Sequence, residues 1–218
     1  MDAESFSNSI HASLARRKRE LTDIRLRIQL TDPNPSYLGW VARASIVLAY
    51  AHWEGFVKES SSKYIKLICA RRIRVDQLHL SLQAACLTSH FKRAQNSEKT
   101  RYLASILTEI DDRRCNVFNV SPEKVIDTES NLSSTVFRDL VLGLGLDHHD
   151  IYDTRKAFID ETLLFARNKI AHGELVSYSR SEAVDRIDGV LLLLDVYADQ
   201  LILAAKENKF LLANGEVP

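Results

Sequence analysis

The sequence predicts a predominantly all-α protein, and three observations predict it. Seven glycines and four prolines make up only 11 of the 218 residues, whereas turn-rich β-sandwiches and barrels need both residue types at their corners. Apolar residues recur at steps of three, four and seven along several long segments, which is the spacing of one helix face. Most of those segments begin and end at residues that cap or interrupt helices.

The first two predicted helices are long and meet at a proline-containing stop. Residues 2–30 carry an amphipathic stripe, and the sequence TDPNP at 31–35 cannot continue a helix. Ser36 is a suitable N-cap for a second helix over 37–69, in which the run SIVLAYAHWEGF is apolar on nearly every side. We expect this helix to be central and Gly55 to mark a close approach of another helix. Residues 2–30 either join the bundle or form an N-terminal extension.

The remaining segments predict shorter helices around one irregular stretch. Helices are expected at 76–89, 97–111, 133–142, 151–170 and 181–212, the last three with N-caps at Ser133, Asp147–Asp150 and Ser181. Residues 115–130 change character and predict short extended pieces. No repeat and no linker long enough to separate domains is present, so 1–218 is expected to form a single helical domain.

Composition excludes several classes of protein. Hydrophobic residues are 45% and charged residues 27% of the chain, which is typical of globular domains and not of disordered or collagen-like chains. Cys69, Cys86 and Cys115 form no CxxC pair, as expected for reduced structural thiols in a cytosolic protein. No apolar run is long enough to span a membrane and no secretory signal is evident. A cytoplasmic location without membrane contact is therefore expected.

The net charge of zero hides an uneven distribution along the chain. Residues 1–114 carry 19 Lys and Arg against 12 Asp and Glu, a balance of +7, and residues 115–218 carry 10 against 17, a balance of −7. Basic clusters at 16–19, 58–74 and 113–114 are either solvated helix faces or surfaces that follow phosphates. The sequence leaves both alternatives open, and such a split is also typical of self-association.

Signatures of common enzymes are absent, so we expect no cofactor and no metal. There is no P-loop, no strand-flanked GxGxxG, no HExxH and no GxSxG. His148 and His149 lack a third ligand and are better explained as part of a helix-capping turn. His52 and Glu54 are ionisable residues within an apolar helix, where either a hydrogen-bonded core position or proximity to a site would account for them.

The segment FARNKIAHGE at 165–174 is the most informative feature. Arg167 and His172 are five residues apart, roughly 140° around an ideal helix, so they converge only if the helix ends near Ala171 and Gly173 permits a turn. Such a pair suits RNA cleavage, because histidine can transfer the proton of a 2′-hydroxyl or leaving oxygen while arginine holds the phosphate. The structural alternative is a helix end where His172 interacts with the last carbonyl groups.

The segment from Arg167 to His172 resembles the R-x4–6-H motif of the HEPN superfamily. The segment WEGFVK at 53–58, the residues Ser130, Asn131 and Leu132 before a helix, and the segment 143–146 also resemble a bacterial branch of HEPN-like ribonucleases. The similarity covers about 37–203.

This resemblance implies a HEPN-like helical bundle and a metal-independent endoribonuclease that acts as a toxin or antiphage-defence effector. It implies a homodimer with both motifs in one cleft, RNA as substrate, and a cognate antitoxin or defence partner protein. By the same resemblance, Arg167 and His172 are catalytic and Asn168 supports them. Glu54 has no counterpart in the family motif and is kept as a supporting neighbour. The alternative is a non-catalytic HEPN module that binds RNA or another protein.

Two further expectations follow from the motif's position. Glu174 stands where the branch controlled by a nucleotidyltransferase antitoxin carries a tyrosine that is modified, so the resemblance does not extend to that control. The motif also lies in the acidic half of the chain. For a ribonuclease, the basic segments before residue 115 must therefore fold beside Arg167 and His172, or be supplied by a second subunit.

Overall fold

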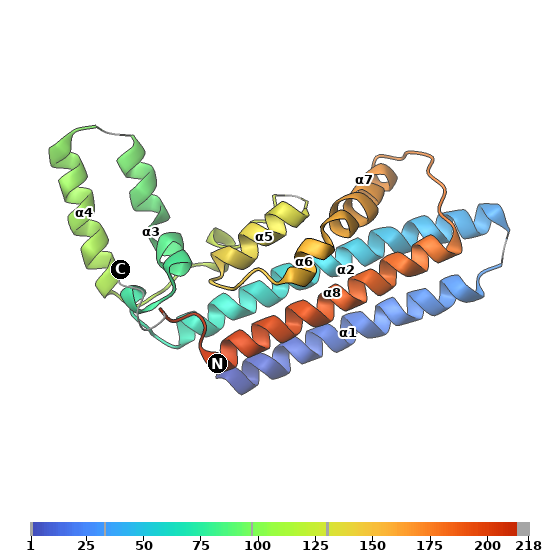
Figure 1. Ribbon diagram of the computed structural model, residues 1–218, viewed down its shortest axis with the longest axis horizontal. Coiled ribbons are helices and arrows are strands. Elements are labelled where there is room, and N and C mark those ends of the chain that lie inside the picture. The colour runs from blue at the N-terminus through green and yellow to red at the C-terminus, as the bar shows by residue number, and fades with distance from the viewer. Residues whose placement is uncertain (1, 33, 97, 130, 213–218) are drawn as a thin grey trace.

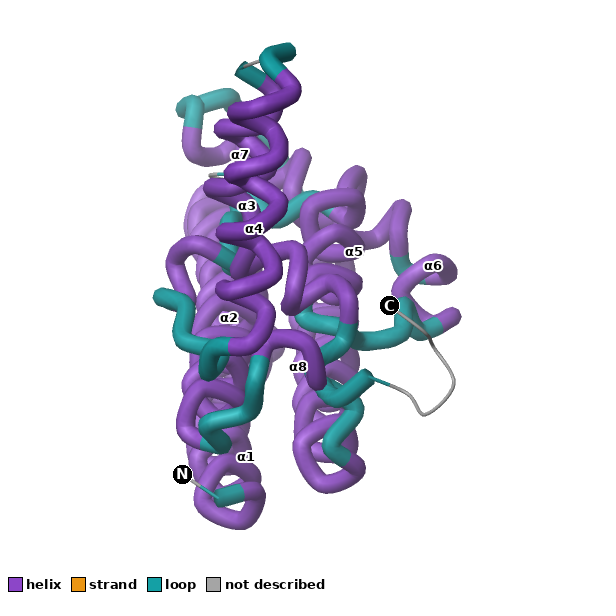
Figure 2. Tube along the Cα trace, turned by 90° about the vertical axis from the view of Figure 1, so that its left-hand side faces the viewer, coloured by secondary structure: helices purple, strands orange, loops and turns teal. Residues whose placement is uncertain are grey.

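The computed structural model describes residues 2–32, 34–96, 98–129 and 131–212. Its helices, in chain order, are α1 (Ala3–Leu30), α2 (Pro35–Ala70), α3 (Leu80–Gln95), α4 (Thr100–Cys115), α5 (Ser134–Gly143), α6 (Asp150–Thr154), α7 (Phe165–Ala171) and α8 (Arg180–Glu207). Two 3₁₀ turns, η1 (Val75–Gln77) and η2 (Pro122–Lys124), and a π-helical segment, η3 (Phe158–Leu164), complete the regular structure. Figure 2 shows helices joined by loops and no strand in these ranges. The all-α prediction is confirmed.

Three long helices, α1, α2 and α8, run side by side and form the main bundle (Figure 1). Their facing stripes are fully buried, as for Phe6 and Leu21 on α1, Trp53 on α2, and Leu194 and Leu201 on α8. Burial of apolar surface is the main stabilising contribution to such a bundle. Residues 2–30 are thus an integral bundle helix.

The close approach expected at Gly55 is present. A Cβ atom at this position would lie 3.2 Å from the Arg17 guanidinium of α1. That guanidinium donates a 2.9 Å hydrogen bond to Glu59 of α2, so the small residue leaves room for a buried arginine that joins the two helices.

Ion pairs between α1 and α8 explain part of the uneven charge distribution. Lys18 pairs with Asp195 at 2.7 Å, and Arg25 pairs with Asp188 at 2.8 Å. All four side chains are 36–44% exposed, so each pair adds little stability, on the order of 0.2–1 kcal/mol. The cations of the basic half and the anions of the acidic half nevertheless face each other across this helix pair.

A second layer formed by α5, α6, η3 and α7 covers α2 and α8 on the side away from α1 (Figure 1). Phe137 of α5 anchors it, because its ring packs edge-on against Trp53, Tyr152 and Tyr197 at centroid distances of 4.9, 4.8 and 5.4 Å. Edge-to-face aromatic packing of this kind fixes the relative orientation of neighbouring helices. The layer carries the Arg167–His172 motif.

The helices α3 and α4 form a hairpin that stands away from the bundle at the far end of α2 (Figure 1). Arg93 and Glu109 pair at 2.5 Å between the two helices. The hairpin keeps large apolar side chains such as Phe91 and Leu107 exposed. It is attached mainly through η1 and α5.

The sequence predictions differ from the structure in several details. The single helix expected at 151–170 is divided into α6, η3 and α7, because the chain widens into π-type turns after Arg155. The caps of α2 and α8 are Asn34 and Ser179, two residues before the predicted Ser36 and Ser181. The extended pieces expected at 115–130 reduce to one isolated bridge, Arg74 with Val117, and the turn η2. The residues Met1, Pro33, Ser97, Ser130 and 213–218 lie outside the described ranges.

Candidate functional site

Arg167 lies in a polar cluster between α7, α2 and the segment 128–132. Its Nη1 donates hydrogen bonds of 2.7 Å to Oδ1 of Asn131 and 2.7 Å to Oδ1 of Asn168. The guanidinium carbon lies 4.8 Å from the ring centroid of Tyr50, within the range of a cation–π contact. The guanidinium is therefore held from two sides by hydrogen-bond acceptors and from below by an aromatic face.

Tyr50 connects this arginine to the buried part of α2. Its side chain is almost fully buried, and its hydroxyl oxygen accepts a 2.7 Å hydrogen bond from the Leu132 backbone N–H. Burial raises the pKa of Tyr50 to about 12, with the Glu54 carboxylate adding to the rise against the opposing effects of Leu132 and Arg167. The phenol therefore stays protonated at neutral pH.

Glu54 faces the same cluster, one helical turn beyond Tyr50. Its Oε1 accepts a hydrogen bond of 3.3 Å from the Thr128 hydroxyl. This contact ties the segment 128–132 to α2 from a second point. Glu54 is thus a neighbour of Tyr50 and Thr128, and no described interaction joins it to Arg167.

His52 belongs to a different face of α2. Its Nε2 lies 3.5 Å from Glu20 of α1. Burial lowers the pKa of His52, Glu20 opposes that effect, and the charge of Arg17 adds to it. His52 therefore takes part in packing α1 against α2 and not in the polar cluster.

His172 ends α7 and is exposed to solvent. Its backbone N–H donates a 2.9 Å hydrogen bond to the Asn168 carbonyl group, and Gly173 follows with φ of +76°. Within the described ranges its imidazole makes no hydrogen bond or ion pair. The helix ends where the sequence predicted, at Ala171, and the glycine provides the left-handed turn. Arg167 and His172 are close along the chain, but no described interaction joins their side chains.

Contacts before the motif fix its helix in place. Asp160, in the π-helical segment, accepts a 2.7 Å hydrogen bond from the Ser134 backbone N–H at the start of α5. Phe158 packs so closely on α8 that a Cβ atom at Gly189 would lie 2.3 Å from its ring. A π-type segment changes the rotational phase of the helix that follows, so these contacts set the face that Arg167 presents to α2.

The loop after the motif is fastened to the bundle. Arg43 of α2 donates a 3.3 Å hydrogen bond to the Val176 carbonyl group, and Arg180 donates a 2.6 Å hydrogen bond to the Thr31 carbonyl group. From the basic half of the chain, Arg43 therefore reaches the motif region.

Two of the three basic clusters lie away from the motif within one chain, whereas the cluster 58–74 begins on α2, where Lys58 is exposed one helical turn beyond Glu54. Residues 16–19 lie on α1, across the bundle from α7, and 113–114 end α4 in the hairpin (Figure 1). Arg16 and Arg17 pair with Glu59, and Lys18 pairs with Asp195. Within one chain, clusters 16–19 and 113–114 therefore do not form the basic face expected next to Arg167 and His172, and part of the charge at 16–19 holds helices together.

The pair His148 and His149 occupies the start of α6. His148 Nε2 lies 3.2 Å from Asp153, and His149 is the N-cap residue. Among the described residues, no group of three or more His, Cys, Asp or Glu side chains is arranged to hold a metal ion.

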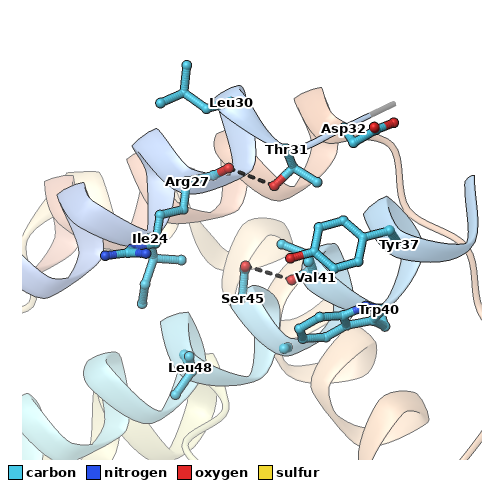
Figure 3. A pocket seen from close by; sticks show the side chains of 11 residues that line it. Ile24, Arg27, Leu30, Thr31, Asp32, Tyr37, Trp40, Val41, Ser45 and Leu48 are labelled. Atoms are coloured by element: carbon cyan, nitrogen blue, oxygen red, sulfur yellow. Dashed lines mark hydrogen bonds between the residues drawn. The ribbon is translucent and has the colours of Figure 1, made fainter. Parts of the chain in front are cut away.

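A cavity of about 620 Å³ opens between the end of α1 and the start of α2 (Figure 3). Tyr37 and Trp40 lie at its edge, each 50% exposed and in edge-on contact at 5.3 Å. Arg167, Asn131 and Tyr50 are not among its lining residues, so this cavity is separate from the polar cluster.

Sequence reasoning missed Tyr50 and Thr128. Tyr50 lies four residues before Glu54, so the two share one face of α2. This spacing could have indicated that Tyr50 lies near Glu54. Thr128 comes from an irregular segment whose position no periodicity predicts. Asn131 was identified through the resemblance alone.

In the described ranges, no helix is long and apolar enough to cross a membrane. A comparison with protein-family models matches residues 12–203 to the family described as RiboL-PSP-HEPN. No curated protein and no solved structure gives a significant match. The matched region contains the whole of α2, the polar cluster and the Arg167–His172 motif. The chain therefore belongs to the RiboL-PSP-HEPN family, and the HEPN superfamily inferred from its motif is confirmed.

Proposed function

We propose that this protein is a metal-independent endoribonuclease in which Arg167 and His172 act on one phosphodiester. Arg167 stabilises the charge that develops on the phosphate, and His172 transfers the proton of the 2′-hydroxyl or of the leaving oxygen. Asn168 and Glu54 support the arginine.

The observation that carries the proposal is the way Arg167 is held. Both of its described hydrogen bonds use Nη1, so Nη2 and Nε have no partner among the described residues. Because the two acceptors share Nη1, the edge formed by Nη2 and Nε stays open for bidentate binding of a phosphate. His172 is exposed five residues further on, where a bound RNA can reach it.

Cleavage of mixed RNA in EDTA tests the proposal. The wild-type protein is expected to cleave, and Arg167→Ala and His172→Ala are each expected to lose most of the activity. Arg138→Ala and His149→Ala are matched controls, because both residues are exposed and lie in α5 or at the start of α6. Cleavage that persists in both motif variants would refute the assignment of these residues.

We propose that the active form is a homodimer that joins two motifs in one cleft. Apolar side chains stand exposed beside the motif, with Phe165 57% and Leu175 99% exposed. Such residues are typical of surfaces that are covered in an assembly. A second subunit would also add cations near the motif, since one chain does not bring its clusters at 16–19 and 113–114 there.

A toxin or antiphage-defence role in the cytoplasm is part of the proposal, with chain 1–218 acting as a single domain. The three free thiols are consistent with a reducing compartment. Glu174 lies 3.9 Å from Lys169 in the position where a tyrosine would be modified. We therefore expect a cognate partner to control the protein by binding. Growth arrest on expression, absent in His172→Ala, tests the toxic role.

The second candidate is a non-catalytic module that binds RNA or a protein. The contacts of Arg167 with Tyr50 and Asn131 favour this module, because an arginine that stabilises the fold needs no catalytic role. In that case Arg167→Ala would lower the melting temperature, and the wild-type protein would bind RNA without cleaving it.

A further inference from the structure

Two adjoining cavities lie where α3 faces the segment 119–125, at the base of the projecting hairpin. Their volumes are about 530 and 460 Å³. They share Ala85, Thr88, Lys92 and Lys124, so they form one continuous depression, here called the hairpin cleft. The cleft is at the far end of the molecule from α7 (Figure 1).

The charges that line the hairpin cleft have one sign. Lys92, Arg113 and Lys124 line it together with His90, and no Asp or Glu is among its described lining residues. Arg113 donates to the carbonyl groups of Val117 and Asn119 at 3.2 and 3.3 Å, which orients the guanidinium without neutralising it. In the ranges that the structure covers, neither lysine has a carboxylate partner.

Two acidic side chains contact lining residues of the cleft without being part of its lining. Glu109 pairs with Arg93 at 2.5 Å and lies 3.9 Å from His90. Glu123 accepts a hydrogen bond from the Ser121 hydroxyl. The lining itself therefore keeps an excess of positive charge from Lys92, Arg113 and Lys124, and concave surfaces of one sign concentrate the field that attracts polyanions.

An aromatic ring and polar side chains complete the lining. Phe91 is 47% exposed at one side of the cleft. Thr88, Ser89, Asn119 and Ser121 supply hydroxyl and amide groups. Cations that follow phosphates, together with an exposed ring on which a base can stack, are the combination found in grooves for single-stranded nucleic acid.

We propose that the hairpin cleft binds the sugar–phosphate backbone of single-stranded RNA at a distance from the cleaved bond, with a base stacked on Phe91. The proposal rests on the proposed function for the choice of RNA as the polyanion. Cys69 near the end of α2 touches Val120 of the cleft, and Tyr50 touches Arg167. Nineteen helical residues separate the two, roughly 30 Å at 1.5 Å per residue. The cleft therefore contacts phosphates remote from the motif of its own chain.

Binding of a 2′-O-methyl oligonucleotide of about 20 residues, followed by fluorescence anisotropy, tests the cleft without cleavage. Lys92→Ala/Lys124→Ala is expected to weaken binding roughly tenfold at 0.15 M salt and to make the slope of log K against log salt about 1.4 less negative, since each contact with a single strand contributes about 0.7. Lys92→Arg/Lys124→Arg keeps the charge and is expected to bind as wild type. Lys156→Ala/Lys206→Ala, on exposed sites of the bundle and second layer, is the matched control.

Competing ligands identify the kind of anion. Phe91→Ala is expected to weaken RNA binding, whereas Phe91→Tyr preserves it. The proposal fails if the double alanine variant binds RNA like wild type. It also fails if inorganic phosphate binds these lysines at micromolar concentration while their replacement leaves RNA binding unchanged. A third refuting result is polyglutamate that binds as tightly as RNA and depends on the same lysines.

The cleavage assay separates this proposal from the proposed function. With RNA of about 20 residues, the double alanine variant is expected to raise KM and leave kcat unchanged, because the lysines lie far from the motif. Cleavage with unchanged RNA affinity in the variant would refute the proposed role of the cleft and leave the proposed ribonuclease activity standing. Lysine-dependent RNA binding without any cleavage would support the proposed role of the cleft and refute the proposed ribonuclease activity.

Discussion

Replacing Asn131 with alanine tests whether the polar cluster positions Arg167 for catalysis. The change removes one of two 2.7 Å hydrogen bonds to Nη1 of Arg167. A hydrogen bond to a charged group contributes about 1.5–3 kcal/mol. Asn168 still accepts from the same nitrogen and the Tyr50 ring still lies 4.8 Å away, so we take the lower limit. A loss of about 1.5 kcal/mol in the transition state corresponds to roughly tenfold in rate.

Single-turnover cleavage at varied RNA concentration measures this effect. Asn131→Ala is expected to lower kcat about tenfold with little change in KM, because a displaced guanidinium still attracts the phosphate. Asn131→Asp keeps an acceptor but adds a negative charge beside Arg167, so it is expected to raise KM. In an Arg167→Ala background, Asn131→Ala is expected to have no further effect on rate. Equal effects in the two backgrounds would refute the positioning argument.

Three further predictions address stability, acid sensitivity and assembly. Gly189→Ala is expected to destabilise the fold by about 1–3 kcal/mol, because the new Cβ would lie 2.3 Å from the Phe158 ring; thermal unfolding measures it, and Gly143→Ala, whose Cβ would meet no atom within 4 Å, is the control that should not lose stability. Burial raises the pKa of Glu59, but hydrogen bonds from Lys63 and Arg17 outweigh that effect and lower it to about 2. The stability that ionised Glu59 contributes is therefore present above its unfolded pKa of about 4.5 and lost as pH falls from there toward 2; Glu59→Gln is expected to be less stable at pH 7 and to lose less stability over this window, and an unchanged acid denaturation profile would contradict the assignment. Leu175→Glu, at a side chain that is 99% exposed, is expected to leave the monomer's melting temperature unchanged while light scattering shows dissociation and cleavage is lost; a dimer that persists would place the interface elsewhere.

The elements of the bundle were predictable because local chemistry sets them. The apolar stripes of 2–30 and 37–69 and the TDPNP stop between them correspond to α1 and α2, since no other conformation buries those residues on one face. The end of α7 at Ala171 followed from Gly173. The caps were predicted two residues late at α2 and α8, because Asn34 and Ser179 compete with equally suitable neighbours.

The π-helical segment was not predictable from periodicity. The residues of 151–170 are compatible with an ordinary helix, and the wide turns depend on where Phe158 meets Gly189 and where Asp160 meets Ser134. These are contacts between residues far apart in the sequence. The same reasoning applies to Thr128, which reaches Glu54 from an irregular segment.

The sequence by itself determined the helical class and the family, and it singled out Arg167 and His172 as candidates, because caps, stripes and a short motif are local properties. Only the tertiary structure decided that Glu54 faces Thr128 and His52 faces Glu20 of α1, since two residues on one helix point to different neighbours. It also decided the meaning of the charge split. Cations of α1 pair with anions of α8, whereas the cations that line the hairpin cleft have no carboxylate in the described lining. A sum of charges along the chain cannot distinguish paired from unpaired cations, because electrostatic attraction depends on the distance between charges in space.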